Sequence, residues 1–254
     1  MTTAGLDSSL RPVTSDQTFD ALAEALNGGP AIAPLPDSLV ERAYAVDMLQ
    51  LDKPVEELDA GVVLATSGST GRPKGAVLSR AAVRAAAEAA HTRLGGPGEW
   101  ALALPPYYIA GLMVLARAIT AGTFVHEVGT DLARLPSAVN AMRGRGYLAV
   151  VPTQLDRALT QPHISRALRA LDAVLVGGSA LDPSLQRRAE QAGINVVASY
   201  GMTETCGGCV YDGLPLDGVS VSLEPETQRI RIASVTNFSG YRLRPDLTNM
   251  ALSD

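Results

Sequence analysis

Short, continuous apolar segments alternate with helical patterns along most of the chain, and this alternation limits the fold more than any other feature. The apolar segments cover residues 61–66, 100–104, 123–128, 147–151, 173–176 and 194–199. Runs of this length without polar alternation are typical of strands that are covered on both faces. Strands that alternate with helices favour a parallel or mixed sheet. We therefore expect an α/β protein with a sheet that is covered on both faces.

Apolar side chains at helical spacing predict helices over residues 15–27 and 38–50. The prolines between these two segments predict an irregular connection over residues 30–36. A further helix should begin after Ser79, which is a suitable N-cap, and should end at the glycines of residues 95–96.

The longest apolar segment, residues 108–119, is interrupted by Arg117 and is too short to cross about 30 Å of hydrocarbon. We interpret it as a core helix and expect no membrane span. The first twenty residues lack the basic start and the apolar run of a secretory signal. These features favour a cytoplasmic protein.

The last part of the chain differs in character from the rest. Apolar residues alternate with serines over residues 219–223 and with arginines over residues 230–232. This period of two predicts an antiparallel hairpin with one solvent-exposed face. We predict an α/β core over residues 1–212 and a small β subdomain of the same large domain over residues 213–254.

The composition excludes some classes of partner. The chain of 254 residues carries 21 basic and 26 acidic side chains, for a formal net charge of −5. Proteins that bind nucleic acids or anionic membranes usually carry a basic excess, so we expect neither as the main partner. A small acidic ligand would therefore need a local positive site.

The two cysteines, Cys206 and Cys209, are spaced C-x2-C. This spacing occurs in redox pairs and in zinc sites, but a structural zinc needs four ligands, and His91, His126 and His163 show no ligand spacing. The favoured interpretation is two thiols close together on a loop in a reduced, cytoplasmic protein.

A glycine- and hydroxyl-rich stretch follows the apolar run of residues 61–66. Residues 66–75 read Thr-Ser-Gly-Ser-Thr-Gly-Arg-Pro-Lys-Gly and contain Lys74, one of only two lysines in the chain. Glycines let backbone N–H groups turn toward an anion, hydroxyls donate to phosphate oxygens, and a cation neutralises the charge. The stretch is not a Walker A loop, because Gly75 stands where that loop has a hydroxyl. We predict a phosphate-binding loop.

This string resembles the signature loop of the adenylate-forming enzymes, which include acyl- and aryl-CoA ligases, luciferases and the adenylation domains of peptide synthetases. Further matches in family order are residues 176–180, residues 199–205 and, more weakly, residues 105–111. The resemblance covers about residues 64–218. It implies the large N-terminal domain of the adenylate-forming fold, with layered mixed or parallel sheets flanked by helices. It also implies ATP-dependent activation of a carboxylic acid as an acyl-adenylate, followed by thioester formation with coenzyme A.

The resemblance implies roles for individual residues. Lys74 and the loop would hold the β- and γ-phosphates of ATP, and Thr203 would contact the α-phosphate. Glu204, with Thr66 nearby, would bind Mg²⁺, and Tyr200 would lie against adenine. The implied catalytic residues are Lys74, Thr203 and Glu204. The implied ATP-binding residues are Thr66, Ser67, Gly68, Ser69, Thr70, Gly71, Gly178, Ser179, Ser199, Tyr200, Gly201, Met202 and Thr203.

Within the family, the chain is most similar to the o-succinylbenzoate-CoA ligases of menaquinone biosynthesis. Residues 106–122 resemble their acid pocket, although those ligases commonly carry His at the position of Tyr108. The resemblance implies that Arg117 binds the second carboxylate of the substrate. A lone Arg on an apolar helix can equally pair with a structural acid, and both interpretations stay open. The residues implied for the acid are Tyr107, Tyr108, Arg117 and Gly177.

The implied activity needs ATP, Mg²⁺ and coenzyme A as a co-substrate. Family members also use a mobile C-terminal domain with a second catalytic lysine, so we expect this chain to bind substrates and to be nearly inactive by itself. The alternatives are a non-catalytic module that binds a nucleotide or acyl-adenylate, a ligase for another aryl acid, and a ligase with a carrier-protein acceptor. We expect a small carboxylic acid as partner. A homodimer is also open, because members of the family often dimerise.

Overall fold

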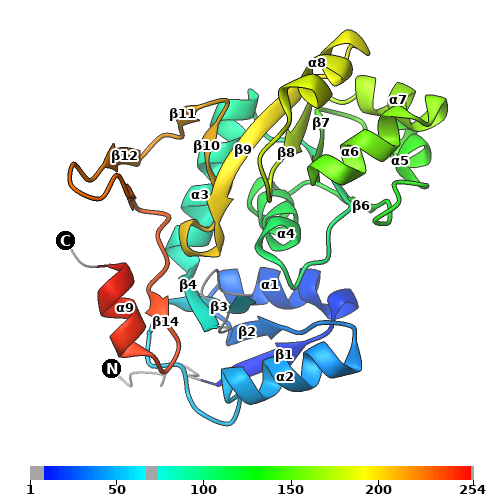
Figure 1. The fold of residues 1–254 in the computed structure, drawn as a ribbon. Helices are drawn as coiled ribbons and strands as arrows, with labels where there is room; N and C mark the ends of the chain where they lie inside the picture. Colours follow the sequence, from blue (N-terminus) through cyan, green and yellow to red (C-terminus); the bar gives the residue numbers. More distant parts are fainter. Residues whose placement is uncertain (1–8, 67–73, 253–254) are drawn as a thin grey trace.

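The computed structural model describes residues 9–66 and 74–252, which form two main sheets and the helices packed around them (Figure 1). Five neighbouring strands of the larger sheet are parallel, and two further strands extend it in antiparallel orientation. The order of the seven strands within the described residues is β11 (Leu214–Pro215), β10 (Gly207–Tyr211), β9 (Val196–Met202), β8 (Ala173–Val176), β7 (Gly146–Val150), β5 (Glu99–Leu102) and β6 (Val125–Glu127).

The smaller main sheet is mixed. Its five strands in the described part of the chain are ordered β1 (Leu10–Val13), β2 (Ala31–Pro34), β3 (Ala60–Thr66), β4 (Lys74–Ser79) and β14 (Gly240–Tyr241). The first three run parallel, and β4 is antiparallel to both β3 and β14. The last strand therefore brings a segment from the end of the chain beside Lys74.

Helices separate and cover the two sheets. Between the sheets lie α1 (Thr18–Leu26), which follows the 3₁₀ turn η1 (Ser15–Gln17), together with α3 (Arg80–Leu94) and α4 (Ile109–Ala121). The outer face of the smaller sheet is covered by α2 (Leu39–Leu49). The outer face of the larger sheet is covered by α5 (Leu135–Ala141), α6 (Pro152–Leu159), α7 (Pro162–Arg169) and α8 (Pro183–Gln191). The predicted α/β architecture of layered sheets flanked by helices is confirmed.

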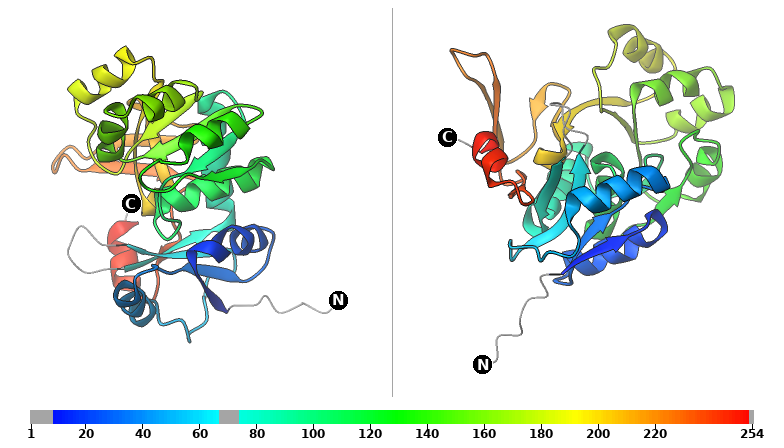
Figure 2. Two further views of the ribbon diagram at one scale, coloured as in Figure 1. Left: turned by 90° about the vertical axis from the view of Figure 1, so that its right-hand side faces the viewer. Right: turned by 60° about the horizontal axis from the view of Figure 1, so that its bottom comes forward.

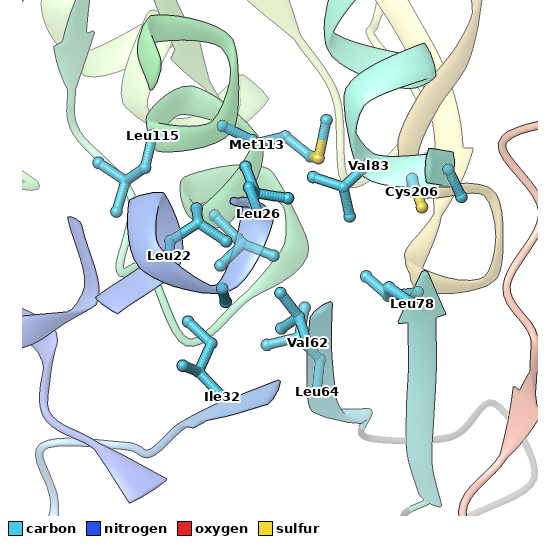
Figure 3. Close-up of a cluster of buried hydrophobic side chains, with 14 of the residues drawn as sticks. Leu22, Leu26, Ile32, Val62, Leu64, Leu78, Val83, Met113, Leu115 and Cys206 are labelled. Carbon is cyan, nitrogen blue, oxygen red and sulfur yellow. The ribbon is translucent and has the colours of Figure 1, made fainter. Parts of the chain in front are cut away.

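One buried cluster joins the smaller sheet to the helices above it (Figure 3). Leu22 of α1, Val62 of β3 and Leu78 of β4 are fully buried in it, as is Met113 of α4. Burial of each such side chain stabilises the fold by roughly 1.5–3 kcal/mol. Because α4 contacts both sheets, this cluster fixes the larger sheet relative to the smaller one.

The predicted signals at the ends of α3 are confirmed. The Ser79 hydroxyl accepts a hydrogen bond from the N–H of Ala82 at 3.0 Å, which satisfies one of the free donors of the first turn. Gly95 ends the helix with a φ of +90°, a left-handed conformation that glycine adopts without strain. The helix of residues 38–50 is also present as α2, between Ser38 and Gln50.

The prediction of an irregular connection over residues 30–36 is wrong, because β2 forms there. Ala31, Ile32 and Ala33 are buried between β1 and β3, which supply the backbone partners of the strand. The prolines lie at the ends of this short apolar segment, where a missing N–H disturbs the ladder least. Burial on both faces outweighs the local effect of proline.

The predicted hairpin is present as β12 (Val219–Leu223) and β13 (Ile230–Ser234), which pair antiparallel. It stands away from the two main sheets (Figure 2). The expectation that only one face meets solvent is wrong, because the apolar side chains of Val221, Leu223 and Ile230 are also exposed.

The segment after residue 213 contributes to both main sheets. It supplies β11 to the larger sheet and β14 to the smaller one, and it ends in α9 (Pro245–Ala251). The division of the chain at residue 213 stays a prediction.

No helix of residues 9–66 and 74–252 combines the length and the apolar character that crossing a membrane requires.

The expectation that both cysteines lie on a loop is wrong. Cys206 follows the 3₁₀ turn η2 (Thr203–Thr205), and Cys209 lies within β10; both are buried and unbonded to each other. Burial raises the pKa of the Cys206 thiol to about 12 and also raises that of Cys209. Since the thiolate is the reactive form, burial makes both thiols less reactive than an exposed cysteine.

Candidate active site

Three adjoining cavities lie at the carboxyl ends of β3, β8 and β9. Gly178, which follows β8 with a φ of +82°, lines all three. Ligands commonly bind at the carboxyl ends of the strands in α/β sheets. We name each cavity after one residue: the Arg117 cavity of about 110 Å³, the Tyr200 cavity of about 490 Å³ and the Lys74 cavity of about 660 Å³.

The Lys74 cavity is built by the register of the smaller sheet. Thr66 and Lys74 are directly opposite in the β3–β4 pair, and Tyr241 of β14 is opposite Ala76, so the three side chains lie on one face. The Lys74 ammonium lies 4.5 Å from the centre of the Tyr241 ring. The Thr66 hydroxyl is buried and has no hydrogen-bond partner among the described residues.

Glu204 enters the Lys74 cavity from η2, directly after β9. The turn is closed by the Thr205 hydroxyl, which accepts from the N–H of Met202 at 3.0 Å and donates to the carbonyl of Gly207 at 2.7 Å. The carbonyl of Glu204 accepts from the N–H of Phe238 at 2.8 Å. Its carboxylate oxygen Oε1 accepts from the Tyr241 hydroxyl at 2.6 Å. Both the backbone and the side chain of Glu204 are thus tied to the segment that ends in β14.

Tyr241 is a neutral donor in this arrangement. Burial raises the pKa of its hydroxyl, and the hydrogen bond to Glu204 and the charge of that carboxylate raise it further. The hydroxyl therefore keeps its proton at neutral pH and donates a hydrogen bond to Glu204. The second carboxylate oxygen, Oε2, makes no hydrogen bond or ion pair with a described residue.

The Lys74 cavity suits an anion and one divalent cation. The Lys74 ammonium makes no hydrogen bond or ion pair with residues 9–66 and 74–252, so its donors are available. The same residues contain no group of three or more His, Cys, Asp and Glu side chains that could hold a metal alone. Mg²⁺ usually binds through one or two carboxylates together with substrate phosphates and water. Glu204 and the unpartnered Thr66 hydroxyl fit that mode of binding.

The Tyr200 cavity brings together Ser179, Ser199, Tyr200 and Gly201, all expected to bind the nucleotide. Tyr200 is exposed, so its ring is available to an incoming planar group. Gly201 lies against β10, where a Cβ would stand 1.9 Å from the carbonyl oxygen of Gly207. Any side chain at that position would push the two strands apart and distort the turn that carries Glu204.

The Arg117 cavity contains a buried cation without an acidic partner. Arg117 is 4% exposed and lies on one face of α4 with Ile109 and Met113. Its guanidinium donates to the Tyr211 hydroxyl at 3.2 Å and lies 4.8 Å from the centre of the Trp100 ring. Its Nε atom has no partner, and no described carboxylate forms an ion pair with it.

These contacts bear on one of the two interpretations of Arg117 that the sequence left open. A structural acid is absent from its surroundings in the described residues, so the pairing interpretation is wrong there. Burial and the positive charge of Arg117 lower the pKa of the nearby His91 to about 4, so His91 adds no second charge. An uncompensated buried cation is costly, and an anionic ligand in the cavity would compensate it.

Of the other residues expected to bind the acid or the phosphates, only some line a cavity in the described part of the chain. Gly177 lines the Arg117 cavity. Tyr107 and Tyr108 precede α4, their rings pack tilted against each other with centres 4.7 Å apart, and neither lines any of the three cavities. Their proposed role stays a prediction. The loop residues Ser67, Gly68, Ser69, Thr70 and Gly71 lie outside the described residues.

Several lining residues were missed by the sequence analysis. Tyr241 lines the Lys74 cavity, and only the pairing of β14 with β4 brings it there. Ile109 and Met113 line the Arg117 cavity, and a signal for them existed. They precede Arg117 by eight and four residues, the spacing of one helix face.

The comparisons with known proteins agree with this arrangement. The model of the family described as "AMP-binding enzyme" matches residues 9–235. The chain belongs to this family. A protein of Mycobacterium tuberculosis named "Probable 2-succinylbenzoate--CoA ligase" is 45% identical over 228 residues, which are 87% of this chain and 58% of the relative. The 2-succinylbenzoate-CoA ligase of Escherichia coli K12 is 30% identical over 88% of this chain and 48% of the relative. This member of the family thus spans less than two thirds of the relatives' length.

Solved structures show the same fold. The o-succinylbenzoate CoA synthetase of Bacillus subtilis, solved with its acyl-adenylate intermediate OSB-AMP, matches with a TM-score of 0.81 at 19% identity. That match covers 97% of this chain and 80% of the other. A double mutant of the same enzyme bound to a product analogue matches with a TM-score of 0.82 over 97% of this chain and 63% of the other. The predicted large N-terminal domain of the adenylate-forming fold is confirmed.

Proposed function

We propose that this AMP-binding domain binds MgATP and an aromatic dicarboxylic acid, and that the enzyme it represents joins the acid to coenzyme A through an acyl-adenylate. One observation carries the proposal: two cavities that share Gly178 each contain a cation with no acidic partner among the described residues. Lys74 is in one of them, and the buried Arg117 is in the other. A triphosphate in the Lys74 cavity and a dicarboxylate that reaches the Arg117 cavity would compensate both charges.

The proposed reaction has two steps, and residues of the Lys74 cavity would act in the first. The carboxylate of the acid attacks the α-phosphorus of ATP, a new oxygen–phosphorus bond forms, and the bond to the β-phosphate breaks to release pyrophosphate. Lys74 would hold the leaving phosphates, and Thr203 would contact the α-phosphate. Two anions must approach each other, so cations and N–H donors set in place beforehand lower the barrier. Thioester formation would follow when the thiol of coenzyme A displaces AMP.

Glu204, together with phosphate oxygens of ATP, would hold Mg²⁺ in the Lys74 cavity, and the ion would neutralise charge on those oxygens. Neighbouring residues hold the Glu204 carboxylate in position for this role. Glu204 is fixed by the N–H of Phe238 and by the Tyr241 hydroxyl, and the Thr66 hydroxyl lies on the same face as Lys74.

The names of the relatives support an aryl dicarboxylate as the acid. Two relatives carry 2-succinylbenzoate in their names, and two solved structures of this fold contain derivatives of that acid. 2-Succinylbenzoate has two carboxylates, so one can be activated while the other is bound. The unpaired Arg117 is suited to the second carboxylate because a guanidinium can hold it with two parallel hydrogen bonds.

A thermal-unfolding series tests the proposal. A ligand that binds only the folded state at one hundred times its Kd adds about 2.7 kcal/mol of stability. For a chain of this size, that should raise the thermal midpoint by about 5–10 °C in the presence of saturating ATP and Mg²⁺. GTP at the same concentration is the control for non-specific effects of nucleotide and metal. An unchanged midpoint with millimolar MgATP would contradict the proposal.

Lys74→Met should weaken the binding of ATP by about thirtyfold and change the affinity for AMP by less than twofold. The reason is that the lost ammonium would contact the pyrophosphate half, which AMP lacks. Calorimetric titrations of both nucleotides measure the two effects. Lys53→Met is the matched control, because Lys53 is exposed and lines none of the three cavities. Equal losses for ATP and AMP would remove Lys74 from the phosphate site.

A further inference from the structure

Tyr241 contacts two oppositely charged side chains at once. Its hydroxyl donates to Glu204 Oε1 at 2.6 Å, and its ring faces the Lys74 ammonium at 4.5 Å. Lys74 and Glu204 form no ion pair with each other, although both line the same cavity. The tyrosine thus stands between a cation and an anion that would otherwise attract each other.

Separation of these charges matters for what the cavity can bind. A Lys74–Glu204 ion pair would occupy the ammonium that a phosphate needs and the carboxylate that a divalent cation needs. The Tyr241 hydroxyl holds only one carboxylate oxygen and leaves Oε2 available. The ring holds the ammonium by a cation–π contact, which leaves its N–H donors available.

The strand β14, which carries Tyr241, lies beside α9 and β4 (Figure 1). The N–H of Tyr241 donates to the Thr248 hydroxyl of α9 at 2.8 Å, and the Phe238 ring packs edge-on against the Tyr241 ring at 4.8 Å. The pairing of Tyr241 with Ala76 of β4 fixes its position along the strand. A residue whose backbone is held by a neighbouring strand and a helix, and whose ring packs against another ring, is suited to holding other side chains at a set distance.

We infer that Tyr241 is a positioning residue that keeps Glu204 and Lys74 apart and aims the carboxylate at the metal and the ammonium at the phosphates. This inference rests on the proposed function, since it assumes that the Lys74 cavity receives MgATP. Tyr241 would not contact the ligand itself; it acts by fixing the positions of Glu204 and Lys74.

The test compares four variants by calorimetric titration with MgATP and with AMP: Tyr241→Phe, Tyr241→Leu, Glu204→Gln and the double variant Tyr241→Phe/Glu204→Gln. Tyr241→Phe should weaken MgATP binding by about tenfold, as is usual when a group that orients a metal ligand is lost, and should change AMP binding less than twofold. In the Glu204→Gln background the same change should cost less than twofold, because its effect passes through the carboxylate. Tyr241→Leu should lose about a further threefold relative to Tyr241→Phe, because the ring beneath Lys74 is also removed.

Tyr44→Phe on α2 is the matched control, since the Tyr44 side chain is exposed and its hydroxyl makes no hydrogen bond with a described residue. A Tyr241→Phe variant that keeps the parent affinity for MgATP would overturn the inference and leave the proposed function standing. Equal losses for MgATP and AMP, or additive effects in the double variant, would also overturn it, because both indicate a merely structural tyrosine. A parent chain that binds no MgATP would overturn the proposed function and this inference with it.

Discussion

Arg117→Met should weaken the binding of 2-succinylbenzoate by about one hundredfold and leave the binding of the analogue without the ring carboxylate within about threefold. The guanidinium is 4% exposed and has no carboxylate partner in the described residues, so a bound carboxylate would form a buried charge pair. Removal of one partner from such a pair typically costs 2–5 kcal/mol, and roughly 2.7 kcal/mol corresponds to one hundredfold. Calorimetric titration with each acid at saturating AMP measures both affinities without turnover.

The substitution should leave the fold intact, because it removes a buried charge that no acid compensates. The Tyr211 hydroxyl would lose one hydrogen bond, and the thermal midpoint of the variant shows whether that loss matters. Arg93→Met is the matched control, since Arg93 donates to the backbone carbonyl of Tyr211 and lines none of the three cavities. A loss of affinity that is equal for the two acids would indicate a folding role for Arg117.

Arg242→Met should lower the free energy of unfolding by about 3 kcal/mol, which corresponds to a fall of roughly 6–12 °C in the thermal midpoint. The buried guanidinium, next to β14, donates to the carbonyls of Leu49, Gln50, Lys53 and Pro54 at 2.5–3.2 Å. Hydrogen bonds from a charged donor are worth about 1.5–3 kcal/mol each, and water can replace only part of them in the variant. Chemical denaturation followed by circular dichroism measures the loss.

Arg244→Met provides the comparison, because Arg244 is exposed and its side chain pairs only with Asp246 among the described residues. An exposed pair of this kind contributes about 0–1 kcal/mol. If the two variants were equally stable, Arg242 would not anchor the segment after α2. A destabilised Arg242→Met variant should also bind MgATP less tightly, because Arg242 directly follows Tyr241 and its N–H donates to the carbonyl of Gly75 at 2.7 Å.

The C-terminal part of the described chain therefore serves the site as well as the fold. β14 adds an edge to the smaller sheet, supplies Tyr241 to the Lys74 cavity and, through Arg242, ties the end of α2 to that edge. The sequence analysis assigned these residues to a small β subdomain and gave them no part in binding. Pairing between residues so far apart along the chain leaves no local pattern that could have indicated the role.

Much of the fold and part of the candidate site could be predicted from local patterns. The apolar runs of residues 147–151 and 173–176 correspond to β7 and β8, and Ser79 caps α3, because burial and capping depend on neighbours within a few residues. The resemblance to the adenylate-forming enzymes also placed Lys74 and Glu204 in one proposed site, and both line the Lys74 cavity. β2 was missed, because its strand character depends on partners supplied by β1 and β3.

The sequence by itself determined the α/β class, the family, and which side chains carry charge in the proposed site. Only the tertiary structure decided that Arg117 is buried against Trp100 without a described acid, and that Tyr241 stands between Lys74 and Glu204. The physical reason is that a side chain's charge and helical or strand preference are local properties. Its partners are set by packing and register between segments up to a hundred or more residues apart.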